Sequence, residues 1–360
     1  TSSLLLEQGS YLLYLGSSSR GIRLIGAVHL GRDVVLKQVA RVGGEPDFTD
    51  WKPAPLPQPA LAAGLPVVEL NLASIQMPAA APARPDPAAM ALVKGMTDEE
   101  LADLCIGGYT GQGSDEMVGN AGRKVLGAAG ETCDWYTARG IPSLVMADGP
   151  AGLRLCQTYG VDGQGQYPVN CHPYDDLLEE MPEETLARLP LKLPAQRSGR
   201  LYEQNCTAIP VGMALAQSWN PAAVEVCGDV VGDEMERFGV HLWLAPALNI
   251  HRLPLCGRNF EYFSEDPYLA GKMAAAYVRG IQSKGVAACP KHFAVNSQEL
   301  RRMSMDSVVD ERTLREIYLT GFEIAVKEGH PKTIMSSYNQ VNGVYANENP
   351  HLLSEILRKE

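Results

Sequence analysis

The chain has 360 residues, of which 45% are hydrophobic and 20% charged, and this composition is typical of an ordinary globular protein. Its formal net charge of −11 at pH 7 argues against nucleic acid or an anionic membrane surface as a partner. No apolar run reaches the ~18 residues of a membrane-spanning helix, and no signal peptide is recognisable at Thr1. We therefore expect a cytoplasmic protein without a membrane partner.

Residues 1–52 are predicted to be β-structure. Three short apolar runs, at residues 11–15, 22–28 and 34–39, are separated by polar turns. Three strands make only part of a sandwich, so we interpret this region as the end of a β-sandwich domain. Proline and alanine dominate residues 53–87, which favours either an extended, semi-rigid linker or simple disorder.

The large domain is predicted to span residues 88–360. A capping box of Thr97 and Glu100 begins its first helix. Two further helices begin where proline follows asparagine or aspartate, at the first helical position. The expected helices cover about 97–105, 220–238, 266–284, 310–326 and 350–360.

Apolar runs alternate with these helices and predict strands at residues 141–148, 208–213, 241–246, 286–292 and 332–339. Such alternation implies a parallel sheet, and the lack of a G-x-G-x-x-G motif after a strand counts against a dinucleotide-binding fold. The predicted fold class is α/β, namely a (β/α) TIM-type barrel that is incomplete in this chain. A polar, proline-rich stretch at about 156–205 is predicted to be a surface insertion that overhangs the site.

Polar side chains follow three of the predicted strands at the point where each strand ends. The carboxyl ends of barrel strands meet at one face, so we expect these side chains to converge. The candidate site residues are Asp148, Arg154, Arg258, Lys291, His292 and Tyr338. Converging charged donors and acceptors suit a polyhydroxylated ligand, and the carboxylate of Asp148 argues against an anionic one.

Other chemistries find little support in the sequence. No Ser–His–Asp order and no histidine cluster with metal-ligand spacing is present. The eight cysteines form no C-x-x-C pair, which argues against a zinc site and indicates free thiols in a reducing compartment. We expect no cofactor and no metal, and we interpret Glu261 and Glu265 as partners in structural ion pairs.

Four motifs, in order between residues 97 and 360, resemble glycoside hydrolase family 3. They are Asp148-Gly-Pro-Ala-Gly-Leu-Arg154, the segment 257–271 that begins Gly-Arg-Asn-Phe-Glu, Lys291-His-Phe-Ala, and Met335-Ser-Ser-Tyr-Asn339. The resemblance implies a barrel that binds the non-reducing sugar of a β-glycoside. It implies that Asp148 binds the far hydroxyls of that sugar, that Tyr338 stands beside the nucleophile, and that Met335 forms a wall. The implied hydroxyl-binding groups are Arg154, Arg258, Lys291 and His292, with a cis peptide bond between the last two.

The resemblance also implies that the catalytic carboxylates lie elsewhere. The family's nucleophilic aspartate follows the helix that ends at Glu360, and its acid/base glutamate lies in a separate α/β domain. We therefore assign no catalytic residue within residues 1–360 and expect this polypeptide alone to be inactive. The β-rich start is similar to the inverted domain order of a subset of the family, in which a fibronectin-III-like domain precedes the barrel.

The implied function is that of a retaining exo-β-glucosidase, with this chain carrying the sugar-binding part. Residues 294–296 differ from the N-acetylglucosaminidase branch, and the xylosidase branch usually has glutamate in place of Asp148. Three alternatives stay open: an inactive sugar-binding or regulatory homologue, β-xylosidase-type specificity, and an unrelated barrel enzyme acting on phosphorylated sugars. The expected partners are β-linked glucosides or oligosaccharides and the remainder of the same polypeptide, and homo-oligomer formation is left open.

Overall fold

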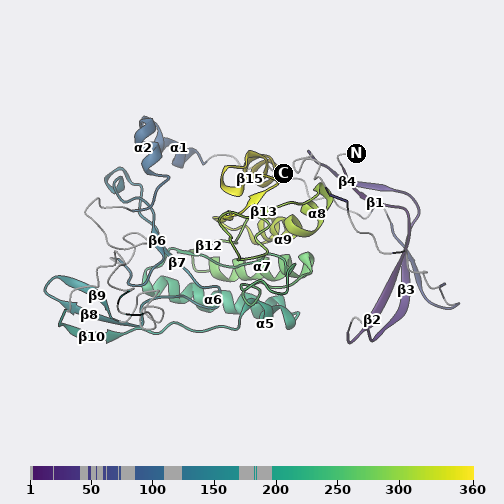
Figure 1. The fold of residues 1–360 in the computed structure, drawn as a ribbon, viewed down its shortest axis with the longest axis horizontal. Helices are drawn as coiled ribbons and strands as arrows, with labels where there is room; N and C mark the ends of the chain where they lie inside the picture. The colour runs from purple at the N-terminus through teal and green to yellow at the C-terminus, as the bar shows by residue number, and fades with distance from the viewer. Residues whose placement is uncertain are drawn as a thin grey trace. The chain divides into compact units, whose positions relative to one another are not determined.

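The computed structural model describes residues 3–18, 20–40, 86–108, 124–169 and 197–360, together with 48–49, 54, 60–61, 63–71, 73, 182 and 184. The chain divides into two compact units (Figure 1). Unit 1 comprises Thr1–Ala83 and Pro350–Glu360, and unit 2 comprises Arg84–Asn349. The predicted domain boundaries after residues 52 and 87 stay a prediction, because most of 53–85 lies outside the described residues.

The described part of unit 1 consists of short strands and one helix. Its elements are β1 (Ser3–Leu6), β2 (Gly9–Gly16), β3 (Ile22–Leu30), β4 (Val34–Gln38), β5 (Val67–Glu69) and η7 (His351–Lys359). β2 and β3 form an antiparallel hairpin with β5 parallel to β3, and β1 pairs antiparallel with β4. The three predicted strands and the last helix are confirmed, whereas β1 and β5 were not predicted.

A parallel sheet lies at the centre of unit 2. Its members are β7 (Val145–Ala147), β11 (Leu242–Trp243) and β12 (Ala287–Ala288), with β6 (Gly130–Glu131) antiparallel to β7. Single parallel bridges, Ala247↔Lys291 and Phe293↔Ser336, extend the pairing beyond β12. Ala147, Trp243 and Ala288 are fully buried, as expected for parallel strands covered on both faces.

Helices lead from one parallel strand to the next. α6 (Pro221–Phe238) precedes β11 and α7 (Pro267–Gln282) precedes β12, and the two helices lie side by side (Figure 1). The Asn220 and Asp266 side chains cap these helices, each followed by proline, as predicted. The close contact between the helices requires Gly280, because a Cβ there would lie 2.0 Å from the carbonyl oxygen of Glu225.

The other helical segments of unit 2 agree with most of the predictions. Within the described residues they are α1 (Pro87–Val93), α2 (Asp98–Asp103), η3 (Thr137–Arg139), α5 (Gly212–Gln217), α8 (Glu311–Thr313), η4 (Leu314–Leu319), α9 (Thr320–Ile324), η5 (Ala325–Gly329) and η6 (Ala346–Glu348). The capping box of Thr97 and Glu100 begins α2, as predicted. The run from α8 to η5 is one continuous helical stretch, as predicted for residues 310–326.

The order of strands and helices confirms an α/β fold, but two predicted strands are wrong. Residues 208–211 are not a strand and Gly212 begins α5, because a short apolar run does not distinguish a strand from a helix start. Residues 332–339 form only the bridge at Ser336. The strand in this region is instead β14 (Gln340–Val341), which pairs with β13 (Asp306–Ser307) and β15 (Val344–Tyr345).

The predicted insertion contains a small antiparallel sheet. Its strands are β8 (Thr158–Asp162), β9 (Gly165–Val169) and β10 (Arg200–Glu203), in the order β10-β8-β9. Gly160 lies against the ring of Tyr167, and Arg197 is paired with Asp162. Residues 170–181, 183 and 185–196 lie outside the described part of the chain, so an overhang above the site stays a prediction.

The described residues show no membrane-spanning helix and no metal-binding cluster. None of their helices is both long and apolar enough to cross a membrane. They hold no group of three or more His, Cys, Asp or Glu side chains arranged to bind a metal ion. The seven cysteines among them are free thiols.

Candidate functional site

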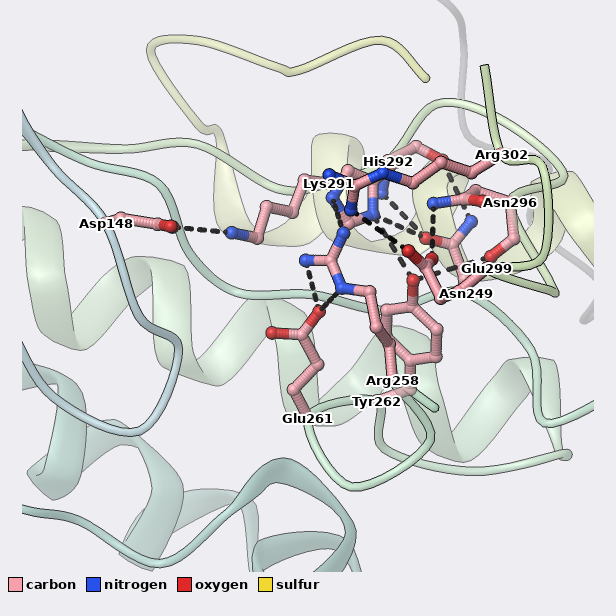
Figure 2. Close-up of polar contacts among 10 residues, drawn as sticks. All are labelled: Asp148, Asn249, Arg258, Glu261, Tyr262, Lys291, His292, Asn296, Glu299 and Arg302. Carbon is pink, nitrogen blue, oxygen red and sulfur yellow. Dashed lines mark hydrogen bonds and ion pairs between the residues drawn. The ribbon is translucent and has the colours of Figure 1, made fainter. Parts of the chain in front are cut away.

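Asp148 and Lys291 form an ion pair across the sheet, where β11 lies between the two strands that they follow. Asp148 follows β7 and Lys291 follows β12, so both stand at the carboxyl end of parallel strands. Lys291 Nζ donates to Asp148 Oδ1 at 3.0 Å, with the lysine side chain 3% exposed and the aspartate side chain 39% exposed (Figure 2). Burial is the largest influence and raises the pKa of Asp148. The charge and hydrogen bond of Lys291, together with the Gly149 amide and the Arg154 charge, outweigh it and hold the pKa below its ordinary value.

A tight loop after Asp148 brings Arg154 back to the same strand end. The Arg154 amide donates to the Asp148 carbonyl oxygen at 3.1 Å. Gly149 adopts a φ of 83° there, and a Cβ on it would lie 2.8 Å from the Gly152 carbonyl oxygen, so the turn favours glycine. The Arg154 charge also lowers the pKa of Asp148. The Asp-Gly-Pro-Ala-Gly-Leu-Arg motif is thus a turn that brings Arg154 near Asp148.

His292 is buried and bonded at both ring nitrogens. Asn249 Oδ1 accepts from the His292 amide at 2.8 Å and lies 3.0 Å from Nδ1, while Asn249 Nδ2 donates to the His292 carbonyl oxygen at 2.9 Å. Arg258 Nη1 lies 2.9 Å from His292 Nε2. A guanidinium only donates, so Nε2 accepts and the ring proton is on Nδ1. Burial, together with the charges of Arg258 and Lys291, lowers the pKa of His292 to about 2, so the ring is neutral.

Arg258 joins this histidine to a buried carboxylate. Its Nε donates to Glu261 Oε1, and Glu261 is 5% exposed. Burial raises the pKa of Glu261, although Arg258 opposes the shift. Glu261 is therefore a structural ion-pair partner, as predicted, whereas Glu265 is exposed.

Tyr262, Asn296, Glu299 and Arg302 lie behind His292. The Tyr262 hydroxyl lies 3.4 Å from His292 Nδ1 and donates to the Asn296 carbonyl oxygen at 3.4 Å. Asn296 Nδ2 donates to Glu299 Oε1 at 3.4 Å, and Arg302 Nη1 donates to Glu299 Oε2 at 3.0 Å. Figure 2 shows these side chains on the far side of His292 from Asp148.

Met335 pairs with the segment that carries His292, and Tyr338 follows three residues later in the chain. The Met335 amide donates to the Pro290 carbonyl oxygen at 3.0 Å, and its carbonyl oxygen accepts from the Phe293 amide at 2.8 Å. Tyr338 is 45% exposed. The Lys291–His292 peptide bond is cis, as the family resemblance implies, and so is Phe293–Ala294.

The structure therefore brings four candidate residues into direct contact, as the Asp148–Lys291 and Arg258–His292 pairs. Arg154 and Met335 are tied to the same strand ends through their backbones. Asn249 and the residues behind His292 were not predicted. A buried amide within the apolar run 245–250 is the one signal that could have indicated Asn249.

Comparison with known proteins identifies the family. The family model described as the glycosyl hydrolase family 3 N-terminal domain matches residues 176–360, about half of the chain. The chain belongs to glycosyl hydrolase family 3. Asp148 precedes the matched segment, and the other three motifs lie within it.

Relatives in this family agree with the assignment. The chain is 43% identical over 273 residues to thermostable beta-glucosidase B of Acetivibrio thermocellus, covering 75% of this chain and 28% of that protein. Beta-glucosidase 3B of Thermotoga neapolitana, solved with alpha-D-glucose, matches with a TM-score of 0.59 and 42% identity over 76% of this chain and 32% of that one. A beta-glucosidase from Paenibacillus barengoltzii matches 100% of this chain and 36% of its own, with a TM-score of 0.69 and 32% identity. The chain thus spans roughly a third of each relative or less.

Proposed function

We propose that the intact protein is a retaining, exo-acting β-glucosidase and that this chain provides the site for the non-reducing terminal glucose. The observation that carries the proposal is a pair of contacts. Asp148 and Lys291 form an ion pair at the carboxyl ends of two strands of one parallel sheet, and Arg258, from a loop, bonds the adjacent His292. These four residues belong to the family motifs, and the similar proteins named above are beta-glucosidases.

The charges of this cluster suit a sugar with several hydroxyl groups. Asp148 uses Oδ1 for Lys291, and its half-exposed carboxylate keeps acceptor capacity for two sugar hydroxyls. The Lys291 ammonium has three donors, of which Asp148 takes one. Arg258 bonds both Glu261 and His292, and these two bonds fix its guanidinium. Its role is then to offer the remaining N–H donors of that group to a sugar hydroxyl. Neutral His292 has a single lone pair on Nε2, which accepts from Arg258, so a sugar hydroxyl that donates to Nε2 takes the place of the Arg258 bond.

Membership of the family excludes the unrelated barrel enzyme for phosphorylated sugars. We also propose that the parallel segments form part of a (β/α) barrel that this chain does not complete. The strands of unit 1 then form the end of a fibronectin-III-like sandwich. Support comes from the alternating strands and helices and from the Paenibacillus enzyme, which matches the whole chain.

The test is hydrolysis by the intact protein of 4-nitrophenyl β-glucoside, β-xyloside and β-N-acetylglucosaminide, with the first-formed anomer identified by NMR. The proposal predicts preference for the glucoside and release of β-glucose, because a retaining enzyme uses two displacements. Preference for the xyloside would support the alternative specificity. A folded protein that binds glucose but hydrolyses none of the three would be an inactive homologue.

A further inference from the structure

Arg302 contacts the ring of Tyr338, and backbone pairing between their segments sets this contact. β13 and β14 pair in parallel with Asp306 opposite Gln340, and the Gln340 amide donates to the Met305 carbonyl oxygen at 2.9 Å. Arg302 precedes β13 and Tyr338 precedes β14 by only a few residues. The guanidinium carbon of Arg302 lies 4.8 Å from the ring centroid of Tyr338, within the ~6 Å limit for a cation–π contact.

Arg302 also forms an ion pair with Glu299. Its Nη1 donates to Glu299 Oε2 at 3.0 Å, and Glu299 Oε1 accepts from the amide of the fully buried Asn296 at 3.4 Å. Figure 2 shows this part of the network reaching Tyr262 and His292. The buried Asn296 amide therefore bonds the carboxylate that pairs with Arg302, and the Arg302 cation lies over the Tyr338 ring.

Tyr338 depends on this contact for its orientation. Its side chain is 45% exposed, and among the described residues its hydroxyl has no hydrogen-bond partner. An exposed tyrosine without such a bond is free to change rotamer. The hydroxyl is therefore available to a ligand or to the nucleophile that the family resemblance places beside Tyr338.

We infer that Arg302, anchored by Glu299, is a positioning residue that holds the Tyr338 ring in place for the sugar and the reacting centre. The inference rests on the proposed function. Arg302 acts through Tyr338 and needs no contact with the substrate. A flat guanidinium lies over an aromatic ring and bonds a carboxylate at the same time, whereas a lysine ammonium serves mainly as a point charge.

The experiment is a double-mutant cycle in the intact protein, with kcat/KM measured on an aryl β-glucoside. Arg302→Met should lower kcat/KM roughly 2- to 5-fold, as expected for loss of a partly exposed cation–π contact, and Arg302→Lys should lower it less. In a Tyr338→Phe background, Arg302→Met should cause little further loss, because the hydroxyl that it positions is gone. As a control, Arg237→Met breaks an exposed ion pair with Asp233 on α6 and should leave kcat/KM unchanged.

If kcat/KM of the double variant falls by the product of the two single-variant losses, Arg302 and Tyr338 act independently and the inference is overturned. Unchanged kinetics in Arg302→Met would also overturn it. If the melting temperature shows that Arg302→Met does not fold, the cycle is repeated with Arg302→Lys in its place. Independent losses in that cycle would overturn the inference in the same way. Wild-type protein that hydrolyses no glycoside would refute the proposed function alone. The inference would then be judged on glucose affinity by calorimetry, where Arg302→Met should weaken Kd roughly 2- to 5-fold and an unchanged Kd would overturn it.

Discussion

Replacing Asp148 by asparagine separates sugar binding from structural support at the strand end. The variant keeps the shape and one acceptor oxygen but removes the charge that faces Lys291 at 3.0 Å. A hydrogen bond to a charged group is worth roughly 1.5–3 kcal/mol. Because the Asp148 side chain is 39% exposed, solvent screens the pair, and we expect the free energy of unfolding to fall by only about 1 kcal/mol.

The loss in catalysis should be larger than this loss in stability. In Asp148→Asn, the bound sugar lacks a charged acceptor in a site from which it has displaced water. This loss should lower kcat/KM at least ~10-fold. The assay pairs the melting temperature with kcat/KM on an aryl β-glucoside. Asp229→Asn is the matched control, since it breaks a pair of 3.0 Å with Lys284 away from the site. A large drop in melting temperature with near-normal kinetics in the folded fraction would refute substrate binding by Asp148.

The stability effect of Asp148 also has a predicted pH dependence. The pKa of Asp148 is lowered in the folded protein, so its contribution is fully present above the unfolded pKa of ~3.9 and is lost as the pH falls through the folded value. The difference in unfolding free energy between wild type and Asp148→Asn should therefore be constant from about pH 7 to 5. Below about pH 4 this difference should shrink toward zero. A gap that persists at pH 2 would show that the charge is not its cause.

Three further predictions follow from the buried groups. His292 has a pKa of about 2 in the folded protein and of ~6.5 in the unfolded chain. Because only the unfolded chain takes up the proton, the free energy of unfolding of wild type should fall by roughly 2 kcal/mol between pH 6.5 and 5. In chemical denaturation, His292→Gln should lack this pH dependence. Asn249 holds His292 through its side-chain amide. Asn249→Leu leaves these buried groups without partners, so it should lower the free energy of unfolding by ~1–3 kcal/mol and lower kcat/KM. Unchanged kinetics would contradict a role for Asn249 in positioning His292. Gly280→Ala should destabilise by ~1–3 kcal/mol without changing kcat/KM of the folded protein, and an unchanged melting temperature would contradict the close helix contact.

Local signals allowed the helices and the strand ends to be predicted. Asn220-Pro221 and Asp266-Pro267 begin helices because the cap and the proline act within one turn. Residues 208–213 had no such signal, and the apolar run proved to lead into α5. Asp148 and Lys291 were predicted because each follows an apolar run, and parallel pairing then brings them together.

The rest of the site depends on contacts between distant parts of the chain. Asn249 bonds His292 across 43 positions, and Arg258 reaches the same ring from a loop without periodicity. Arg302 contacts Tyr338 only because β13 pairs with β14, and neither strand was predicted. Sequence patterns identify residues at strand ends, but hydrogen-bond partners from loops emerge only in three dimensions.

The central claim is that Asp148, Arg258, Lys291 and His292 bind the terminal glucose. A crystal structure of the intact protein soaked with glucose tests it most directly. We predict a glucose molecule whose hydroxyl oxygens lie within ~2.6–3.2 Å of the Asp148 carboxylate and of Lys291 Nζ. Glucose bound elsewhere, with the Asp148–Lys291 and Arg258–His292 pairs unchanged and out of its reach, would contradict the account.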